Sequence, residues 1–159
     1  MNGKNRVTER KQDPPRSNRK PTLSSSIEAK QNLELRLKSL DYTVNVAEKN
    51  LEMQLYVSAA FYIHLAVEKA LKVAIVSLKD EFPEKTHRLQ RLYAEIEDKV
   101  QLTEEQIEFL EELTSVAVSA RYEDMELTDP SEIYTKSIVE EYMQKALPII
   151  EKLRASIQS

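Results

Sequence analysis

Residues 56–78 read YVSAAFYIHLAVEKALKVAIVSL, and this stretch decides the fold of the chain. Apolar or small side chains recur in it every three or four residues, which is the spacing of one face of an α-helix. Further apolar residues occupy the flanking faces, so the predicted helix is apolar nearly all round. Such a helix needs cover from several sides, and it finds that cover at the centre of a bundle. Its few polar residues are where a functional site is expected.

The composition favours a single all-α domain. The chain has 159 residues, of which 41% are hydrophobic and 31% charged, as in an ordinary globular protein. Its single glycine is Gly3, whereas phosphate-binding loops and tight hairpin turns need several. It has no cysteine, which excludes disulfides, thiolate nucleophiles and Cys-zinc sites. Without a long apolar run or an apolar leader, we expect a cytoplasmic protein with no membrane association.

Charge is distributed unevenly along the chain. Residues 1–26 carry seven basic and two acidic side chains, a net charge of +5, whereas the rest has a net charge of −9. Residues 1–23 contain three prolines and few apolar groups, so we expect a disordered basic tail there. This tail is interpreted as a solvated leader, with a weak RNA or partner contact as the alternative. Residues 24–159 form the predicted domain, whose acidic surface argues against broad nucleic-acid binding.

Capping residues, prolines and the helical spacing predict an antiparallel up-and-down bundle of about five helices. The predicted elements are a first helix from about 24–26 to about 50, the central helix, a short third helix capped by Thr86, a fourth from Thr103, and a fifth from Asp129 through Leu153. A break near 50–54 separates the first two helices, and Pro83 follows the end of the second.

Three segments together resemble the HEPN domain family. They are Ala59–Lys72 with its AVEKALK core, THRL at Thr86–Leu89, and RYED at Arg121–Asp124. The resemblance covers about residues 27–153 and implies an antiparallel helical bundle, usually a homodimer, often encoded beside a minimal nucleotidyltransferase. Many members are metal-independent endoribonucleases that use an arginine followed, after four to six residues, by a histidine.

This chain departs from that ribonuclease motif, because no histidine follows His87 and none therefore follows Arg121. RYED resembles instead the RYPD-type variant of members that lack the nuclease motif, with Glu123 in place of proline. We therefore expect a non-catalytic HEPN-like binding module that acts with a partner such as a minimal nucleotidyltransferase and binds a nucleotide. The alternative is an endoribonuclease, the toxin of a toxin–antitoxin pair, with a rearranged active site that uses Arg121 and His87 or His64.

Seven residues are candidates for a ligand-binding or polar cluster. They are Glu68, Lys69, Lys72, His87, Arg121, Tyr122 and Asp124. Glu68 and Lys72 are four residues apart and can form an ion pair on a solvated helix face. If Glu68 is buried instead, Arg121 is its expected partner, because a guanidinium matches a carboxylate with two hydrogen bonds.

His87 follows the predicted cap Thr86 and is expected near a helix N-terminus, where a nucleotide phosphate could bind with the help of a lysine. A local packing or capping role for these two residues is the alternative. His64 and Glu68 share a helix face, but a zinc site needs three or four ligands, so we expect a hydrogen-bonded histidine and no metal or cofactor. The apolar central helix also makes a homodimer plausible.

Arg121→Ala tests the RYED hypothesis. If Arg121 faces inward and binds Glu68 or the Asp124 region, its loss should lower the free energy of unfolding by about 3–5 kcal/mol, since a buried charge is left unpaired. A surface pair would change it by only about 0–1 kcal/mol. Urea unfolding measures the difference, and Glu68→Gln should weaken the fold less than Arg121→Ala. Unchanged stability of Arg121→Ala would mean that the cluster is ordinary surface charge.

Overall fold

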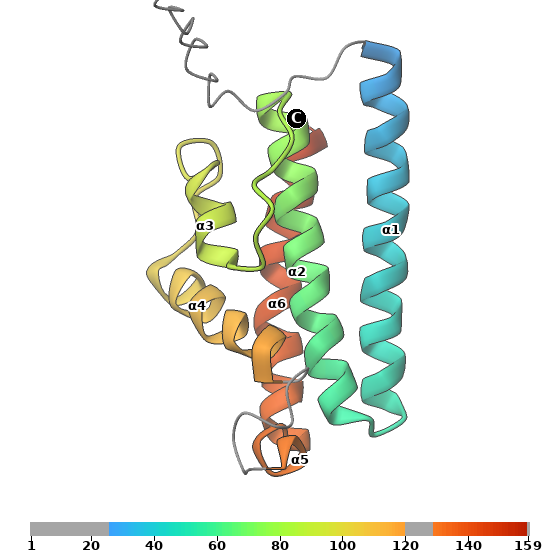
Figure 1. The fold of residues 1–159 in the computed structure, drawn as a ribbon, viewed down its shortest axis with the longest axis vertical. Coiled ribbons are helices and arrows are strands. Elements are labelled where there is room, and N and C mark those ends of the chain that lie inside the picture. The colour runs from blue at the N-terminus through green and yellow to red at the C-terminus, as the bar shows by residue number, and fades with distance from the viewer. Residues whose placement is uncertain (1–25, 120–128, 159) are drawn as a thin grey trace, which may run out of the picture.

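The computed structural model describes residues 26–119 and 129–158, and its elements are all helices (Figure 1). They are α1 Ser26–Glu52, α2 Tyr56–Lys79, α3 Leu89–Ala94, α4 Glu104–Ser119, α5 Pro130–Ile133 and α6 Lys136–Gln158. The predicted all-α helical bundle is confirmed. The predicted tail at residues 1–23 lies outside the described residues, so the domain boundary stays a prediction.

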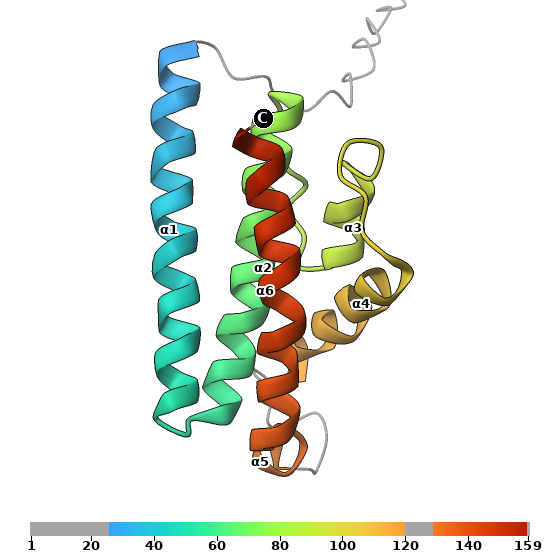
Figure 2. The same cartoon turned by 180° about the vertical axis from the view of Figure 1, so that it is seen from behind.

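Helix α2 lies at the centre of the bundle. α1 packs along one side of it, α6 along another, and α3 and α4 cover a third (Figures 1 and 2). Thirteen of its residues are buried, which agrees with an apolar pattern that runs nearly all round the helix. Because helices of the same chain cover these faces, the predicted homodimer would need another surface and stays a prediction.

The long helices do not simply alternate in direction. α1 and α2 are antiparallel, but α3 and α4 lead the chain back to the end of the bundle where α2 begins, so α6 runs in the same direction as α2 (Figures 1 and 2). The ion pair between Arg154 near the end of α6 and Asp41 in α1 is consistent with this arrangement. Of the helices that the structure describes, none combines the length and hydropathy needed to span a membrane.

The predicted boundaries of α2 are confirmed. α1 ends at Glu52, and Gln54 takes a left-handed conformation with φ 62° that reverses the chain before Tyr56. At the other end, Asp80 is also left-handed, with φ 51°, and its N–H donates to Val76 O as a C-cap. The helix therefore stops before Pro83, as the sequence predicts.

Helix caps explain the later elements. The predicted capping box at the start of α4 is confirmed, since Gln106 N donates to Thr103 Oγ1 at 3.1 Å and Thr103 N donates to Gln106 Oε1 at 3.0 Å. Asp129 caps α5 as predicted, accepting from Ser131 N at 2.9 Å.

The prediction of one fifth helix from Asp129 through Leu153 is wrong. The chain forms the short α5 and then a separate α6, which makes six helices in the described part of the chain. The break falls at Tyr134, whose side chain is buried with only 3% exposed and whose backbone leaves the helical conformation. Thr135 then starts α6, since its carbonyl accepts from Val139 N at 3.0 Å. Burial of an aromatic ring therefore outweighed the continuous helical pattern.

The prediction that Thr86 caps the third helix is also wrong. Thr86 Oγ1 accepts from Arg88 N at 3.1 Å and so closes a turn before the helix, and the N-cap position falls on Arg88 without a side-chain cap. Thr114 of α4 caps the start of α3 instead, since its hydroxyl accepts from Leu89 N at 3.1 Å. A contact distant in sequence thus replaces the expected local one.

Tyr93 offers a stability test of the fold. Its buried hydroxyl donates to Val100 O at 3.0 Å and accepts from Leu102 N at 3.1 Å, which holds the connection between α3 and α4. Tyr93→Phe should lower the free energy of unfolding by about 1–3 kcal/mol, because two buried backbone groups lose their partner. Urea unfolding measures this loss. Tyr42→Phe is the matched control: Tyr42 is 70% exposed, so this variant should unfold like the parent protein. Equal losses of stability in the two variants would contradict the structural role of the Tyr93 hydroxyl.

Candidate functional site

Glu68 is the buried carboxylate of α2, with 4% of the residue exposed, and no other charged residue is buried within the described ranges. α2 carries it inward because the helix is packed on several sides. The chain segment that joins α2 to α3 then lies over it, since His87 of that segment contacts the carboxylate. A carboxylate taken out of water must find charged or hydrogen-bonding partners. This burial excludes the interpretation of Glu68 as part of a solvated helix face.

Three side chains surround the Glu68 carboxylate. Lys72 Nζ donates to Oε1 at 2.8 Å, one helical turn further along α2. His87 Nδ1 lies 3.2 Å from Oε1 and 3.1 Å from Oε2. His64 Nδ1 lies 3.7 Å from Oε2, and its other ring nitrogen is 3.2 Å from the backbone oxygen of His87. We call His64, Glu68, Lys72 and His87 the Glu68 cluster.

The exposure of the side chains in the Glu68 cluster increases from the core to the surface. The side chains of His64 and Glu68 are only 2% and 6% exposed, whereas that of Lys72 is 25% and that of His87 is 62% exposed. The negative charge is therefore at the base and the basic groups are at the rim. An anion arriving from solvent would meet Lys72 and His87 before it met Glu68.

The electrostatic balance keeps Glu68 ionised. Burial alone would raise its pKa, but the hydrogen bonds and positive charges of Lys72 and His87 outweigh burial and hold the pKa below the ordinary value of 4.5. An ionised carboxylate only accepts hydrogen bonds, so the His87 proton is on Nδ1. This orientation leaves Nε2 of His87, which has no partner among the described residues, available at the surface.

Lys69, although next in sequence to Glu68, belongs to a different contact. Its Nζ donates to Ser39 Oγ and to Thr43 Oγ1, both at 2.8 Å, and so joins α2 to α1. Successive residues of a helix point about 100° apart, which separates this lysine from the Glu68 cluster. The sequence grouped the two residues, and the structure does not bring them together.

The remaining predicted site residues have different outcomes. His64 is the hydrogen-bonded bundle histidine that the sequence predicts, with 1% of the residue exposed. Arg121, Tyr122 and Asp124 lie outside the described residues, so their pairing with Glu68 stays a prediction.

His87 lies near a helix N-terminus as predicted, directly before Arg88, the N-cap residue of the six-residue helix α3. The backbone N–H of Leu89, the first residue of α3, donates to Thr114 Oγ1 and is therefore not available to a ligand at His87. The residue is positioned by Glu68 and by the contact of its own carbonyl with His64. A helix dipole therefore does not account for a phosphate site at His87; Lys72 and the imidazole itself would have to supply it.

Metal binding gains no support from the geometry. Across residues 26–119 and 129–158, no three His, Cys, Asp or Glu side chains form a group that could hold a metal ion.

The sequence did not predict the hydrogen bonds of Lys69 with Ser39 and Thr43. The only signal was their spacing of four residues, which places both hydroxyls on one face of α1.

A family model described as "HEPN domain" matches residues 25–156. The chain belongs to the HEPN domain family. A solved structure with a similar fold is the crystal structure of TT1696 from Thermus thermophilus. It has a TM-score of 0.70 and 22% identity, and the similarity covers 78% of this chain and 97% of that one, so it shows a shared overall fold alone. No curated protein matches the chain.

Glu68→Gln tests the balance of charges in the cluster. At neutral pH it should lower the free energy of unfolding by about 1–3 kcal/mol, because hydrogen bonds to a charged group are replaced by weaker ones. The pKa of Glu68 is lowered in the folded state, so its stabilising effect is present above the ordinary value of 4.5 and is lost as the pH falls through the lowered value. Urea unfolding of parent and variant at neutral and acid pH should show the difference shrinking in acid.

The control for this experiment is Glu108→Gln, which removes the same charge from an exposed position of α4. It should leave the free energy of unfolding nearly unchanged at both pH values. A Glu68→Gln effect of constant size across the pH range would contradict an ionised Glu68 with a lowered pKa.

Proposed function

We propose that this HEPN-family protein is a non-catalytic binding module that takes a phosphate-bearing ligand such as a nucleotide at the Glu68 cluster and acts with a partner protein. One observation carries the proposal. The buried carboxylate of Glu68 holds Lys72 and His87 together at the surface, at 2.8 Å and 3.1 Å from its oxygens. Two basic side chains bound to one carboxylate are close enough to contact one phosphate group.

The chemistry of the two surface groups suits a phosphate. The Lys72 ammonium has three N–H donors, and its contact with Glu68 uses one of them. A protonated His87 would add an N–H donor at Nε2, and hydrogen bonds between charged groups are the stronger ones. Because Glu68 already orders both side chains, little conformational entropy would remain to be lost on binding. With His87 protonated, the three groups carry a net charge of +1, which favours an anion.

RNA cleavage is the second candidate, and a specific observation favours it. Glu68 and His87 form a carboxylate–imidazole pair, an arrangement that can orient a general base. Cleavage through the ribose 2′-hydroxyl also calls for a proton donor to the leaving oxygen. His64 is a poor donor, since it is buried and its Nε2 faces the His87 carbonyl. The described cluster thus offers one accessible imidazole, which fits binding better than cleavage.

Membership of the HEPN family supports a partner such as a minimal nucleotidyltransferase and assembly as a homodimer as further parts of this proposal. Because the chain's own helices cover α2, a second copy would have to use another surface. Light scattering at micromolar concentration tests the dimer, and a monomer at all concentrations would contradict it.

Phosphate binding can be tested by titrating adenosine 5′-monophosphate into the protein and following amide chemical shifts, with adenosine as the ligand without phosphate. Lys72→Ala and His87→Ala should each weaken binding about tenfold, which corresponds to the loss of one charge-assisted contact. Lys38→Ala is the matched control, since it removes an exposed lysine of α1 and should leave the affinity unchanged. Equal binding of adenosine and its monophosphate would contradict a phosphate site.

RNA cleavage is tested separately by incubating the purified protein with total RNA and by inducing it in a bacterial host. The binding proposal predicts intact RNA and unchanged growth. Cleavage that His87→Ala abolishes, while urea unfolding shows the variant to be folded, would overturn the non-catalytic assignment and favour the ribonuclease.

A further inference from the structure

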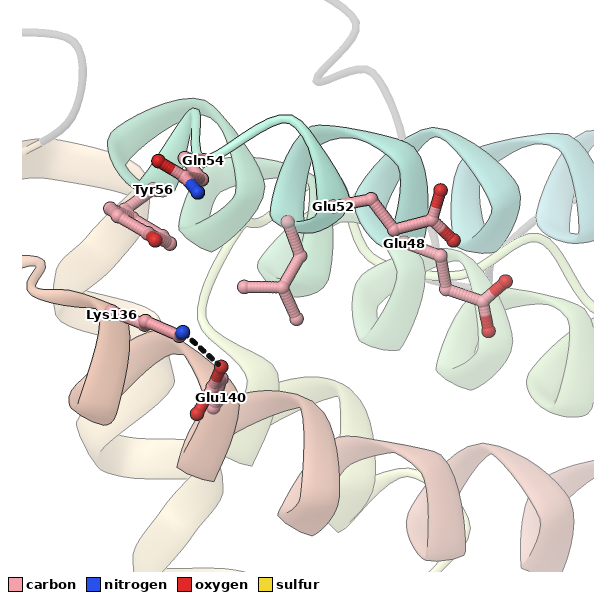
Figure 3. A pocket seen from close by; sticks show the side chains of 7 residues that line it. Glu48, Glu52, Gln54, Tyr56, Lys136 and Glu140 are labelled. Atoms are coloured by element: carbon pink, nitrogen blue, oxygen red, sulfur yellow. Dashed lines mark ion pairs between the residues drawn. The ribbon is translucent and has the colours of Figure 1, made fainter.

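A cleft of about 400 Å³ opens at the end of the bundle where α1 turns into α2 and α6 begins (Figure 3). Tyr56, the first residue of α2, lies with Gln54 at one end of the cleft, on the side of Lys136 and Glu140 of α6, and Glu48 and Glu52 lie farther along α1 (Figure 3). Tyr56 is twelve residues, or about 18 Å along the helix, from Glu68. The cleft is therefore separate from the Glu68 cluster, and the proposed function makes no use of it.

The lining of the cleft favours a cation. Lys136 Nζ lies 3.9 Å from Glu140 Oε1, and Lys49 Nζ lies 3.0 Å from Glu52 Oε2 on α1. Both pairs are exposed, so each is worth only about 0–1 kcal/mol and can be exchanged for a better one. Glu48 has no ion pair or side-chain hydrogen bond within the described residues, which leaves the five groups with a net charge of −1.

An arginine suits this lining better than a lysine does. Its guanidinium can bind a carboxylate through two parallel hydrogen bonds and can also stack on an aromatic face, and Tyr56 is among the residues that line the cleft. The neighbouring turn adds apolar surface, since Met53 is 69% and Leu55 is 48% exposed. The cleft and the turn together fit a short basic segment that also carries an apolar side chain.

The chain itself contains such a segment. Residues 1–26 have a net charge of +5, and within them Val7 is the one large apolar residue between positions 2 and 22. Arg10 and Lys11 follow it closely. We propose that the cleft binds this part of the same chain, with Arg10 between the glutamates and Val7 against the exposed turn.

The reach of the chain excludes Arg19 from the cleft but admits Arg6, Arg10 and Arg16; of these, Arg10 is chosen because Val7 lies three residues before it and Lys11 follows it. The cleft lies about 33 Å from the start of α1, because Glu48 is 22 residues beyond Ser26 along the helix. Arg10 precedes Ser26 by 16 residues, which span up to about 50 Å when extended. Arg19 precedes it by seven residues, which span only about 23 Å. Arg10 can therefore reach the cleft of its own chain and Arg19 cannot.

The test uses the full chain, whose lack of cysteine allows one spin label to be attached at Thr8→Cys. Amide signals of Gln54, Tyr56 and Lys136 should lose at least half of their intensity in the paramagnetic state relative to the reduced state. Arg10→Ala should restore most of that intensity, and so should Glu48→Gln, because each removes one side of the contact. Salt at about 1 M should also restore it, since it shortens the range of exposed charge interactions to about 3 Å.

Matched controls separate a specific contact from general attraction. Arg19→Ala removes the same charge from the basic region, and Glu34→Gln removes a carboxylate from an exposed position nearer the start of α1. Both should leave the signal loss at the cleft unchanged. Signal loss spread over the acidic surface, or equal effects of Arg10→Ala and Arg19→Ala, would overturn the proposal.

A mixed sample distinguishes the segment of the same chain from that of a second copy. It contains spin-labelled chains without ¹⁵N and unlabelled chains with ¹⁵N, so only contacts between chains can weaken the observed signals. No loss at Gln54 or Tyr56 is expected. A signal loss in the mixed sample as large as in chains that carry both the spin label and ¹⁵N would show that the segment comes from another copy. That result would overturn the intramolecular assignment.

Discussion

The structure depends on the need of α2 to be covered on nearly every side. Its buried face includes Ile63, Leu71 and Ile75, each at most 1% exposed, and full burial of such a side chain is worth about 1.5–3 kcal/mol. One neighbouring helix could not cover so wide an apolar surface. Three neighbours therefore cover α2, namely α1, α6 and the α3–α4 pair, each on one side. The same requirement makes any polar residue on α2 costly unless it finds a partner.

Glu68 is where that cost is highest, and its partners come from two directions. Lys72 is supplied by the same helix, whereas His87 is supplied by the connection to α3. The carboxylate therefore ties a loop to the centre of the bundle, and the His87 carbonyl adds a second tie through His64. A group whose burial is unfavourable on its own thus fixes the position of an accessible imidazole. This is the link between the packing of the HEPN fold and the proposed binding of a phosphate.

The Glu68 cluster, at the middle of α2, and the cleft at the start of α2 differ in charge and in chemistry. The Glu68 cluster presents basic groups at its rim, while the cleft beside Tyr56 presents carboxylates. An anionic ligand and a basic segment would consequently be kept apart by the electrostatics of the protein. Lys69 belongs to neither, because its contacts with Ser39 and Thr43 join α1 to α2.

The sequence by itself determined the all-α class, the bounds of α2, the capping box at Thr103 and the family, because these rest on helical periodicity, local hydrogen bonds and family motifs. Tertiary structure alone decided the break at Tyr134, the capping of α3 by Thr114 and the pairing of Glu68 with His87. In each case the partner lies elsewhere in space or burial outweighs a local preference. Periodicity reports which face of a helix is apolar, but the partner of a buried polar group on that face depends on how the helices pack.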